Sequence, residues 1–330
     1  MNNKNGHHYP GMDGEFEEEV EYEESEEEDF EDEESLDLTD EIDHAILMHR
    51  EAHFGGDFTV MIDYYNAEES VGINPDFEPE RILYLSDVEK ELGQDLAALI
   101  LTGAEAEAVG RARQAYAHFK ELYALEENEP SHARLIADLI LSEEEEPLQE
   151  IEAIVEEGPR IVPDLLALLS SDEMYDPIFP GYGYAPYLAI LCLGKIGDPR
   201  GIIPIFETLS KQVTFDEMVI VEALAEMGEP AKEFLLKILK SRPMTQDNPN
   251  AAFALIAFSQ DPRVAIASFE QLKDPIVQDK PLLRTYLLCN CEALNETSYK
   301  ADFITLSESE EIPADLGKEM RAIIQEWDSL

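Results

Sequence analysis

Three stretches in the second half of the chain share one turn at an almost constant spacing. They run from Leu193 to Pro199, from Leu224 to Pro230 and from Ile256 to Pro262, and their prolines lie 31 and 32 residues apart. An acidic residue precedes each proline, and a glycine precedes that acid in the first two stretches. Glycine readily ends a helix with a positive φ, an acidic residue caps the next helix, and proline suits its first turn. The pattern therefore predicts helix–turn–helix units in tandem.

The repeated unit extends toward the N-terminus. The sequence from Pro159 to Leu169 resembles that from Pro199 to Leu209, and Pro130 begins a further candidate copy. One such unit cannot bury its apolar side alone, so neighbouring copies stack into a continuous core. We therefore expect a solenoid of stacked helix pairs over residues 126–330. Residues 39–125 form either a helical cap or divergent repeats, and no alternating strand pattern interrupts the chain, so the expected fold is all-α.

The helix boundaries of the N-terminal region can also be predicted. Thr39 is a candidate N-cap for the first helix, because the acidic residues after it suit a helix N-terminus. Gly55 and Gly56 should end that helix, and Asp57 should cap the next one. A long helix is expected from about Ala104 to Leu125.

The segment from Leu188 to Leu209, with its core Leu-Gly-Lys-Ile-Gly-Asp-Pro, resembles HEAT-like repeats of the phycobilisome-lyase type. The resemblance covers residues 185–275 and extends over 129–275. It implies an α-solenoid with a concave binding surface. HEAT-like deoxyhypusine hydroxylases hold a di-iron centre with adjacent His-Glu pairs, but none of the seven histidines here precedes a glutamate. Chromophore lyases of this kind offer no short motif that transfers to particular residues, so the resemblance names no catalytic residue.

An acidic arm precedes the helical region. From Asp13 to Asp43 there are 20 acidic residues and no basic one, and with Lys4 the first 43 residues carry a charge of −19. Like charges at this density oppose folding, so residues 1–38 are expected to be disordered. Four apolar or aromatic residues interrupt the acidic run: Phe16, Val20, Tyr22 and Phe30. The arm is either a solvating tail or an acidic-aromatic segment that binds a basic partner.

The charge of the whole chain limits its partners. It has 23 basic and 74 acidic residues, a net charge of −51. Nucleic-acid binding depends on Lys and Arg, and an anionic membrane repels such a chain. We therefore expect no direct nucleic-acid partner and no membrane partner. The chain has no long apolar run, no secretory signal and only three cysteines, which predicts a cytoplasmic protein. The predicted function is a noncatalytic protein–protein interaction scaffold or adaptor, with an acidic concave surface for a basic protein and no cofactor.

Histidines suggest an alternative function. His49 and His53 are four residues apart, so one helical face presents both rings, as metal binding requires. The order His-Arg-Glu-Ala-His differs from the His-Glu-x-x-His of metalloproteases. The two rings are either weak candidates for metal ligands or packing residues. The alternative function is a HEAT-like enzyme, lyase-like or metal-dependent, that uses the region from His44 to His53.

One interval of the repeat is longer than the others. Pro159 and Pro199 are 40 residues apart, and the excess of about nine residues maps to an insertion over residues 172–186. Insertions in solenoids fall in loops along one face, which is often the binding face. Five aromatic residues in or beside this loop are candidates for partner binding: Tyr175, Phe179, Tyr182, Tyr184 and Tyr187. In the other interpretation, these rings fold back and cover the adjacent helix pair.

Overall fold

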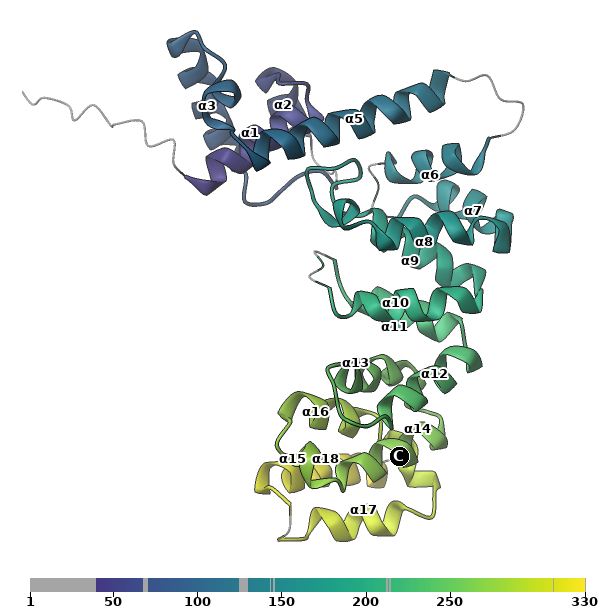
Figure 1. The fold of residues 1–330 in the computed structure, drawn as a ribbon. Helices are drawn as coiled ribbons and strands as arrows, with labels where there is room; N and C mark the ends of the chain where they lie inside the picture. Colours follow the sequence, from purple (N-terminus) through teal and green to yellow (C-terminus); the bar gives the residue numbers. More distant parts are fainter. Residues whose placement is uncertain are drawn as a thin grey trace, which may run out of the picture. The chain divides into compact units, whose positions relative to one another are not determined.

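The structure, a computed structural model, describes residues 40–67, 71–124, 130–142, 144, 146–211, 213, 215–310 and 312–329. The acidic arm predicted for residues 1–38 lies outside these residues. The α-helices are α1 (Glu41–His53), α2 (Phe58–Tyr65), α3 (Pro79–Leu92), α4 (Leu96–Ile100), α5 (Ala104–Ala124), α6 (His132–Ile140), α7 (Leu148–Glu157), α8 (Val162–Ser170), α9 (Ala185–Ile196), α10 (Ile202–Thr208), α11 (Met218–Glu226), α12 (Glu229–Leu239), α13 (Asp247–Ala254), α14 (Pro262–Leu272), α15 (Pro275–Gln278), α16 (Pro281–Cys289), α17 (Lys300–Ser307) and α18 (Ala314–Ser329). Short 3₁₀ helices are η1 (Gly158–Arg160), η2 (Asp172–Tyr175), η3 (Pro199–Gly201), η4 (Leu255–Phe258) and η5 (Glu292–Glu296). The described residues contain no β-strand (Figure 1).

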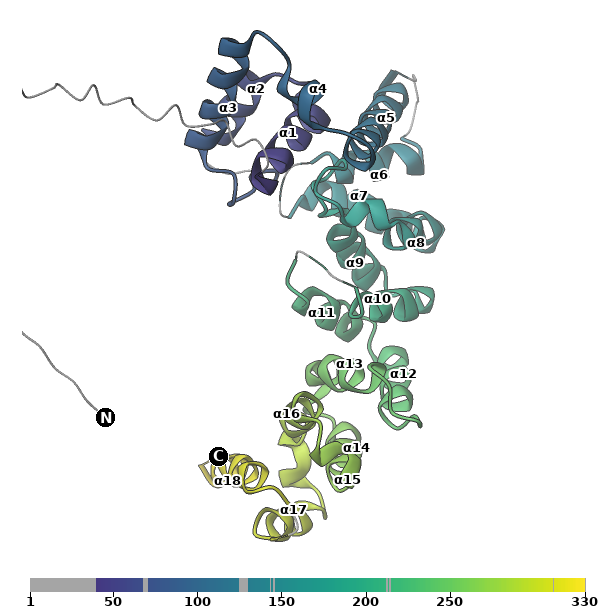
Figure 2. The same cartoon turned by 60° about the vertical axis from the view of Figure 1, so that its left-hand side comes forward.

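Helices from α7 to α16 are stacked in two layers. Helices α7, α9, α11, α13 and α16 follow one another in the first layer, and α8, α10, α12 and α14 follow one another in the second (Figure 2). Each second-layer helix packs on a first-layer helix: α8 on α9, α10 on α11, α12 on α13 and α14 on α16. This arrangement confirms the predicted all-α fold of stacked helix pairs.

The repeated turn has the predicted chemistry in its first and third copies. Gly197 ends α9 with a φ of 68°. Asp198 and Asp261 each accept a hydrogen bond from the backbone N–H two residues later, at 2.9 and 2.8 Å. Each of these caps therefore stabilises the start of the helix that follows it.

The second copy differs from the prediction. Glu229 does not cap α12, because the helix begins at Glu229 itself and its N-cap is Gly228, with a φ of 67°. The Glu229 carboxylate instead forms ion pairs with Lys232, at 2.7 Å, and with Arg263. A glutamate side chain is one methylene longer than an aspartate, and here it reaches a cation on the next unit rather than its own backbone.

The N-terminal helices begin and end close to the predicted positions. The prediction that Thr39 caps the first helix was wrong: Asp40 is the N-cap of α1 and accepts a hydrogen bond from the N–H of Ile42 at 3.0 Å. Asp57 caps α2, as predicted, by accepting from the N–H of Thr59 at 2.8 Å. In both cases the aspartate carboxylate satisfies a backbone N–H group in the first turn of the helix.

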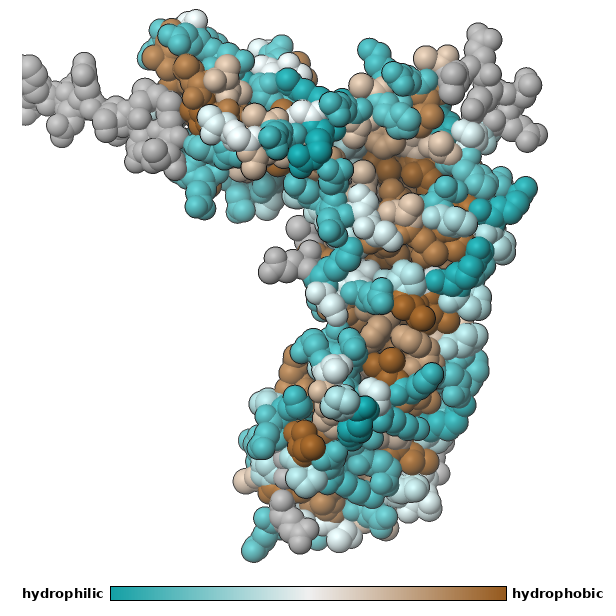
Figure 3. All heavy atoms as spheres, in the orientation of Figure 1, coloured by the Kyte–Doolittle hydropathy of each residue, from teal (hydrophilic) through white to brown (hydrophobic). Residues whose placement is uncertain are grey.

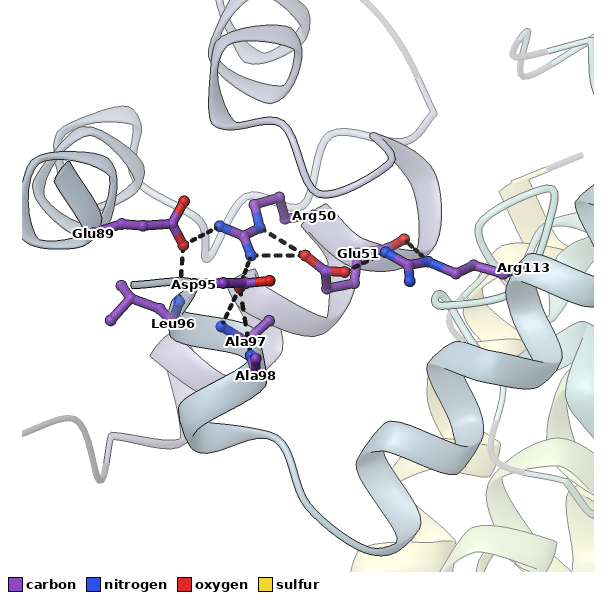
Figure 4. A network of polar contacts seen from close by, with 8 residues as sticks. All are labelled: Arg50, Glu51, Glu89, Asp95, Leu96, Ala97, Ala98 and Arg113. Carbon is purple, nitrogen blue, oxygen red and sulfur yellow. Dashed lines mark hydrogen bonds and ion pairs between the residues drawn. The ribbon is translucent and has the colours of Figure 1, made fainter. Parts of the chain in front are cut away.

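A buried arginine joins these helices. Arg50 of α1 is only 1% exposed and donates hydrogen bonds to Glu89 of α3 at 2.7 Å, to Asp95 before α4 at 2.9 Å, and to its neighbour Glu51 (Figure 4). Arg113 of α5 also donates to Glu51, both to the side chain and to the backbone carbonyl. Two cations therefore offset three carboxylates where four helices meet.

Two large apolar cores and one small apolar cluster underlie the fold. The smaller core runs from Ile46 to Val109, and the larger runs from Leu135 to Trp327. Hydrophobic residues also gather in the spaces between consecutive helices from α6 to α12 on the face that Figure 3 shows. The stacked units thus share one continuous core while leaving grooves with apolar lining between them.

Candidate functional site

A small groove opens between α7, α9 and α11 in the first layer. Its volume is about 210 Å³, and we call it the α9–α11 groove. Its lining residues are Glu146, Leu148, Ile151, Leu191, Lys195, Glu222, Ala223 and Glu226. Leu148 is 67% exposed, the highest value among the exposed large apolar side chains of the described residues. The groove therefore combines apolar area with charge.

The charge of this groove is mainly negative, because three glutamates and one lysine, Lys195, line it. Glu222 and Glu226 lie four residues apart on α11, so their carboxylates share one helical face. Neither forms an ion pair with any described residue, and the same holds for Glu146 across the groove. Like charges at this spacing destabilise a helix by a few tenths of a kcal/mol, about 0.2–0.5. Their presence on an otherwise apolar helix therefore does not stabilise α11.

A glycine sets the width of the groove. A Cβ atom built on Gly194 of α9 would lie 2.8 Å from the Cα atom of Ala223 and 2.9 Å from Oε2 of Glu226 on α11. Only a residue without a side chain allows α9 and α11 to approach so closely. Sequence reasoning missed this role, although a glycine inside a helix is itself a signal of close packing, because it costs about 1 kcal/mol relative to alanine.

The aromatic loop predicted to bind a partner contacts the N-terminal helices. Phe179 is 2% exposed and packs with Ala52 and Ala112, and Tyr182 is 8% exposed. The Tyr182 ring lies 4.3 Å from the ring of His53, measured between centroids. The rings of Phe179 and Tyr182 therefore pack against other residues of the same chain.

The other three aromatic residues are half-buried. The Tyr175 hydroxyl donates to the carbonyl of Leu169 at 3.2 Å, and its ring faces Lys211. Tyr184 and Tyr187 form an edge-to-face pair with centroids 6.0 Å apart at the start of α9. These two rings lie where α9 starts in the first layer, and each keeps partly accessible area there.

The two candidate histidines lie together against that loop. The centroids of the His49 and His53 rings are 4.5 Å apart. Nε2 of His53 donates to the carbonyl of Pro177 at 2.9 Å, since a carbonyl can only accept, and Nδ1 then accepts from the Tyr116 hydroxyl at 2.6 Å. The structure thus brings together the His pair and Tyr182, two features that are far apart in the sequence and that no local pattern could connect.

Burial keeps both imidazoles neutral. Burial, together with the neighbouring His53, lowers the pKa of His49 to about 3. Burial also lowers the pKa of His53 to about 4, although the hydrogen bond to Pro177 favours the protonated ring. Nε2 of His49 is buried without a hydrogen-bond partner, but the rings around it are aromatic. Among the residues that the structure describes, no three His, Cys, Asp or Glu side chains are placed to hold a metal ion.

Comparison with known proteins gives no relative. No family model matches the sequence, and no curated protein or solved structure is significantly similar to the chain. The HEAT-like resemblance therefore depends on the residues of the repeated turn alone. No described helix is both long and apolar enough to cross a membrane.

Proposed function

We propose that the chain is a noncatalytic interaction scaffold of the HEAT-like kind, and that its first layer binds a basic protein. The observation that carries this proposal is the α9–α11 groove, in which three carboxylates that form no ion pair with a described residue outnumber the one lysine, Lys195, beside an exposed leucine. Unpaired charge beside accessible apolar area is typical of a binding surface rather than of a structural one. The cytoplasmic location expected from the sequence belongs to the same proposal, and all three cysteines are free thiols.

The expected ligand is a helix with basic residues on one side and apolar residues on the other. Its apolar side would cover Leu148, and full burial of a leucine side chain contributes about 1.5–3 kcal/mol. Its Lys or Arg residues would pair with Glu222 and Glu226. The charge of −51 would attract such a helix from a distance and raise the rate of association.

The test is a binding assay with a fluorescein-labelled helical peptide of lysine and leucine. In the full chain, Glu222→Gln combined with Glu226→Gln should weaken binding about tenfold, because two charged contacts are lost. The matched control is Glu152→Gln combined with Glu156→Gln. These residues also lie four apart on an exposed helical face, of α7, but they do not line the groove.

The control isolates the groove from the charge of the whole chain, because both double variants remove two negative charges. Equal weakening by both pairs would show only general attraction between opposite charges and would refute the proposal. Leu148→Ser gives an independent measurement, since it should weaken peptide binding without changing the net charge.

A further inference from the structure

A second groove lies between α12 and α14 in the second layer. Its volume is about 560 Å³, and we call it the α12–α14 groove. Its lining residues are Glu233, Leu236, Lys237, Lys240, Arg263, Ile266, Ala267, Glu270 and Gln271. Leu236 and Ala267 are buried and Ile266 is half-buried, so together they form an apolar floor. Charged side chains border this floor.

The cations of this groove differ in how they are paired. Arg263 is neutralised by ion pairs with Glu229, Glu233 and Asp261. Lys237 and Lys240, by contrast, are exposed and form no ion pair with any described residue. The positive charge left over in the groove is therefore that of two lysines three residues apart, Lys237 in the last turn of α12 and Lys240 at its C-cap, which lie on one side of the helix.

This part of the chain also stands out by composition. Residues 229–274 contain six basic and six acidic residues, a net charge of zero, so the remaining 284 residues carry the whole charge of −51. At physiological ionic strength the Debye length is about 8 Å, which screens the groove from most of that distant negative charge. An anion in contact with Lys237 and Lys240 is therefore governed by the charges of the groove.

We propose that the α12–α14 groove docks an acidic, leucine-containing segment of a second protein. Carboxylates of the segment pair with Lys237 and Lys240, and its apolar side chain covers Ile266 over the floor of Leu236 and Ala267. This surface is distinct from the α9–α11 groove in layer, in helices and in sign of charge. The scaffold then holds two partners of opposite charge, one on each layer.

The experiment measures fluorescence anisotropy of a glutamate-rich peptide with a central pair of leucines, at physiological ionic strength, against the full chain. A peptide with glutamine at each glutamate position is the uncharged reference, and it should bind at least tenfold more weakly. Lys237→Glu combined with Lys240→Glu should weaken binding of the acidic peptide by about tenfold or more. Lys120→Glu combined with Lys280→Glu is the matched control, because these lysines are also exposed and form no ion pair with a described residue. This control should change binding less than twofold.

A second measurement needs no variant. Acetylation of the wild-type chain, followed by mass spectrometry, should modify Lys237 and Lys240 more slowly when the acidic peptide is present, whereas Lys120 and Lys280 should react at unchanged rates. Equal affinity for the glutamate and glutamine peptides, equal loss in both double variants, or uniform acetylation rates would each overturn the inference. None of these outcomes bears on the basic peptide, whose site is tested by residues of the other groove.

Discussion

The His49–His53 pair predicts that acid loosens the N-terminal helices. Both rings have folded-state pKa values, about 3 and about 4, well below the value near 6.5 of a free imidazole. Between those values the unfolded state binds more protons than the folded state, so stability rises with pH. The contribution of the two neutral histidines to stability is complete above about pH 6.5 and is lost as the pH falls toward 4.

The magnitude follows from the same pKa values. At pH 5, protonation of a free imidazole favours the unfolded state by about 2 kcal/mol, whereas both buried rings stay neutral. The two histidines together should therefore lower the free energy of opening by about 4 kcal/mol between pH 7 and pH 5. Replacing His49 by Phe retains the contacts with Phe54 and Phe77 and should remove about half of this loss.

Amide hydrogen exchange, read by mass spectrometry over α1 and corrected for intrinsic rates, measures this opening directly. Acid also relieves repulsion among the carboxylates, but it does so equally in the wild-type chain and in His49→Phe. The difference between the two chains is therefore the diagnostic quantity. If His49→Phe loses as much protection between pH 7 and pH 5 as the wild-type chain, the buried imidazoles do not control the stability of these helices.

Two further predictions concern helix packing and buried charge. Gly194→Ala should lower the free energy of unfolding by about 1–3 kcal/mol, because its Cβ would overlap Ala223 and push α9 from α11. Gly110→Ala, inside α5 with nothing within 4 Å of the new Cβ, should instead stabilise by about 0.5–1 kcal/mol in the same urea titration, and a similar loss in both would contradict the reasoning. Arg50→Met should cost about 3 kcal/mol, because the buried carboxylate of Glu51 and the half-buried one of Glu89 lose this cation. Lys90→Met, which breaks the exposed pair with Asp87, should cost at most about 1 kcal/mol. The protection of the α3 amides from hydrogen exchange would distinguish the Arg50 variant from the Lys90 variant.

The repeated turn was predictable because its chemistry is local. A glycine, an acid and a proline in sequence determine where one helix ends and the next begins, so Gly197, Asp198 and Asp261 behave as the sequence predicts. Glu229 does not, because its longer side chain has an alternative partner on another unit, and that partner cannot be recognised from neighbouring residues. The N-cap of α1 is a similar case. Thr39 and Asp40 are both suitable capping residues, and the path of the chain into the helix decides which of them is the N-cap.

The candidate sites were less predictable, because they depend on residues from separate helices. Nothing near Leu148 in the sequence indicates that Glu222 and Glu226 lie beside it. The sequence predicts an insertion rich in aromatic residues, but composition alone does not show that Phe179 and Tyr182 are covered by α1 and α5. The network around Arg50 is a further case, since its carboxylates come from three different segments (Figure 4).

The packing of the insertion against α1 has a practical consequence for dividing the chain. A fragment beginning at residue 126 would contain every copy of the repeated turn, but it would also strip Phe179 and Tyr182 of their cover. Such a fragment would present bare aromatic rings to water and would be prone to self-associate. A shortened version meant for crystals or for binding work is better cut before Asp40, so that the first helix stays with the loop it shields.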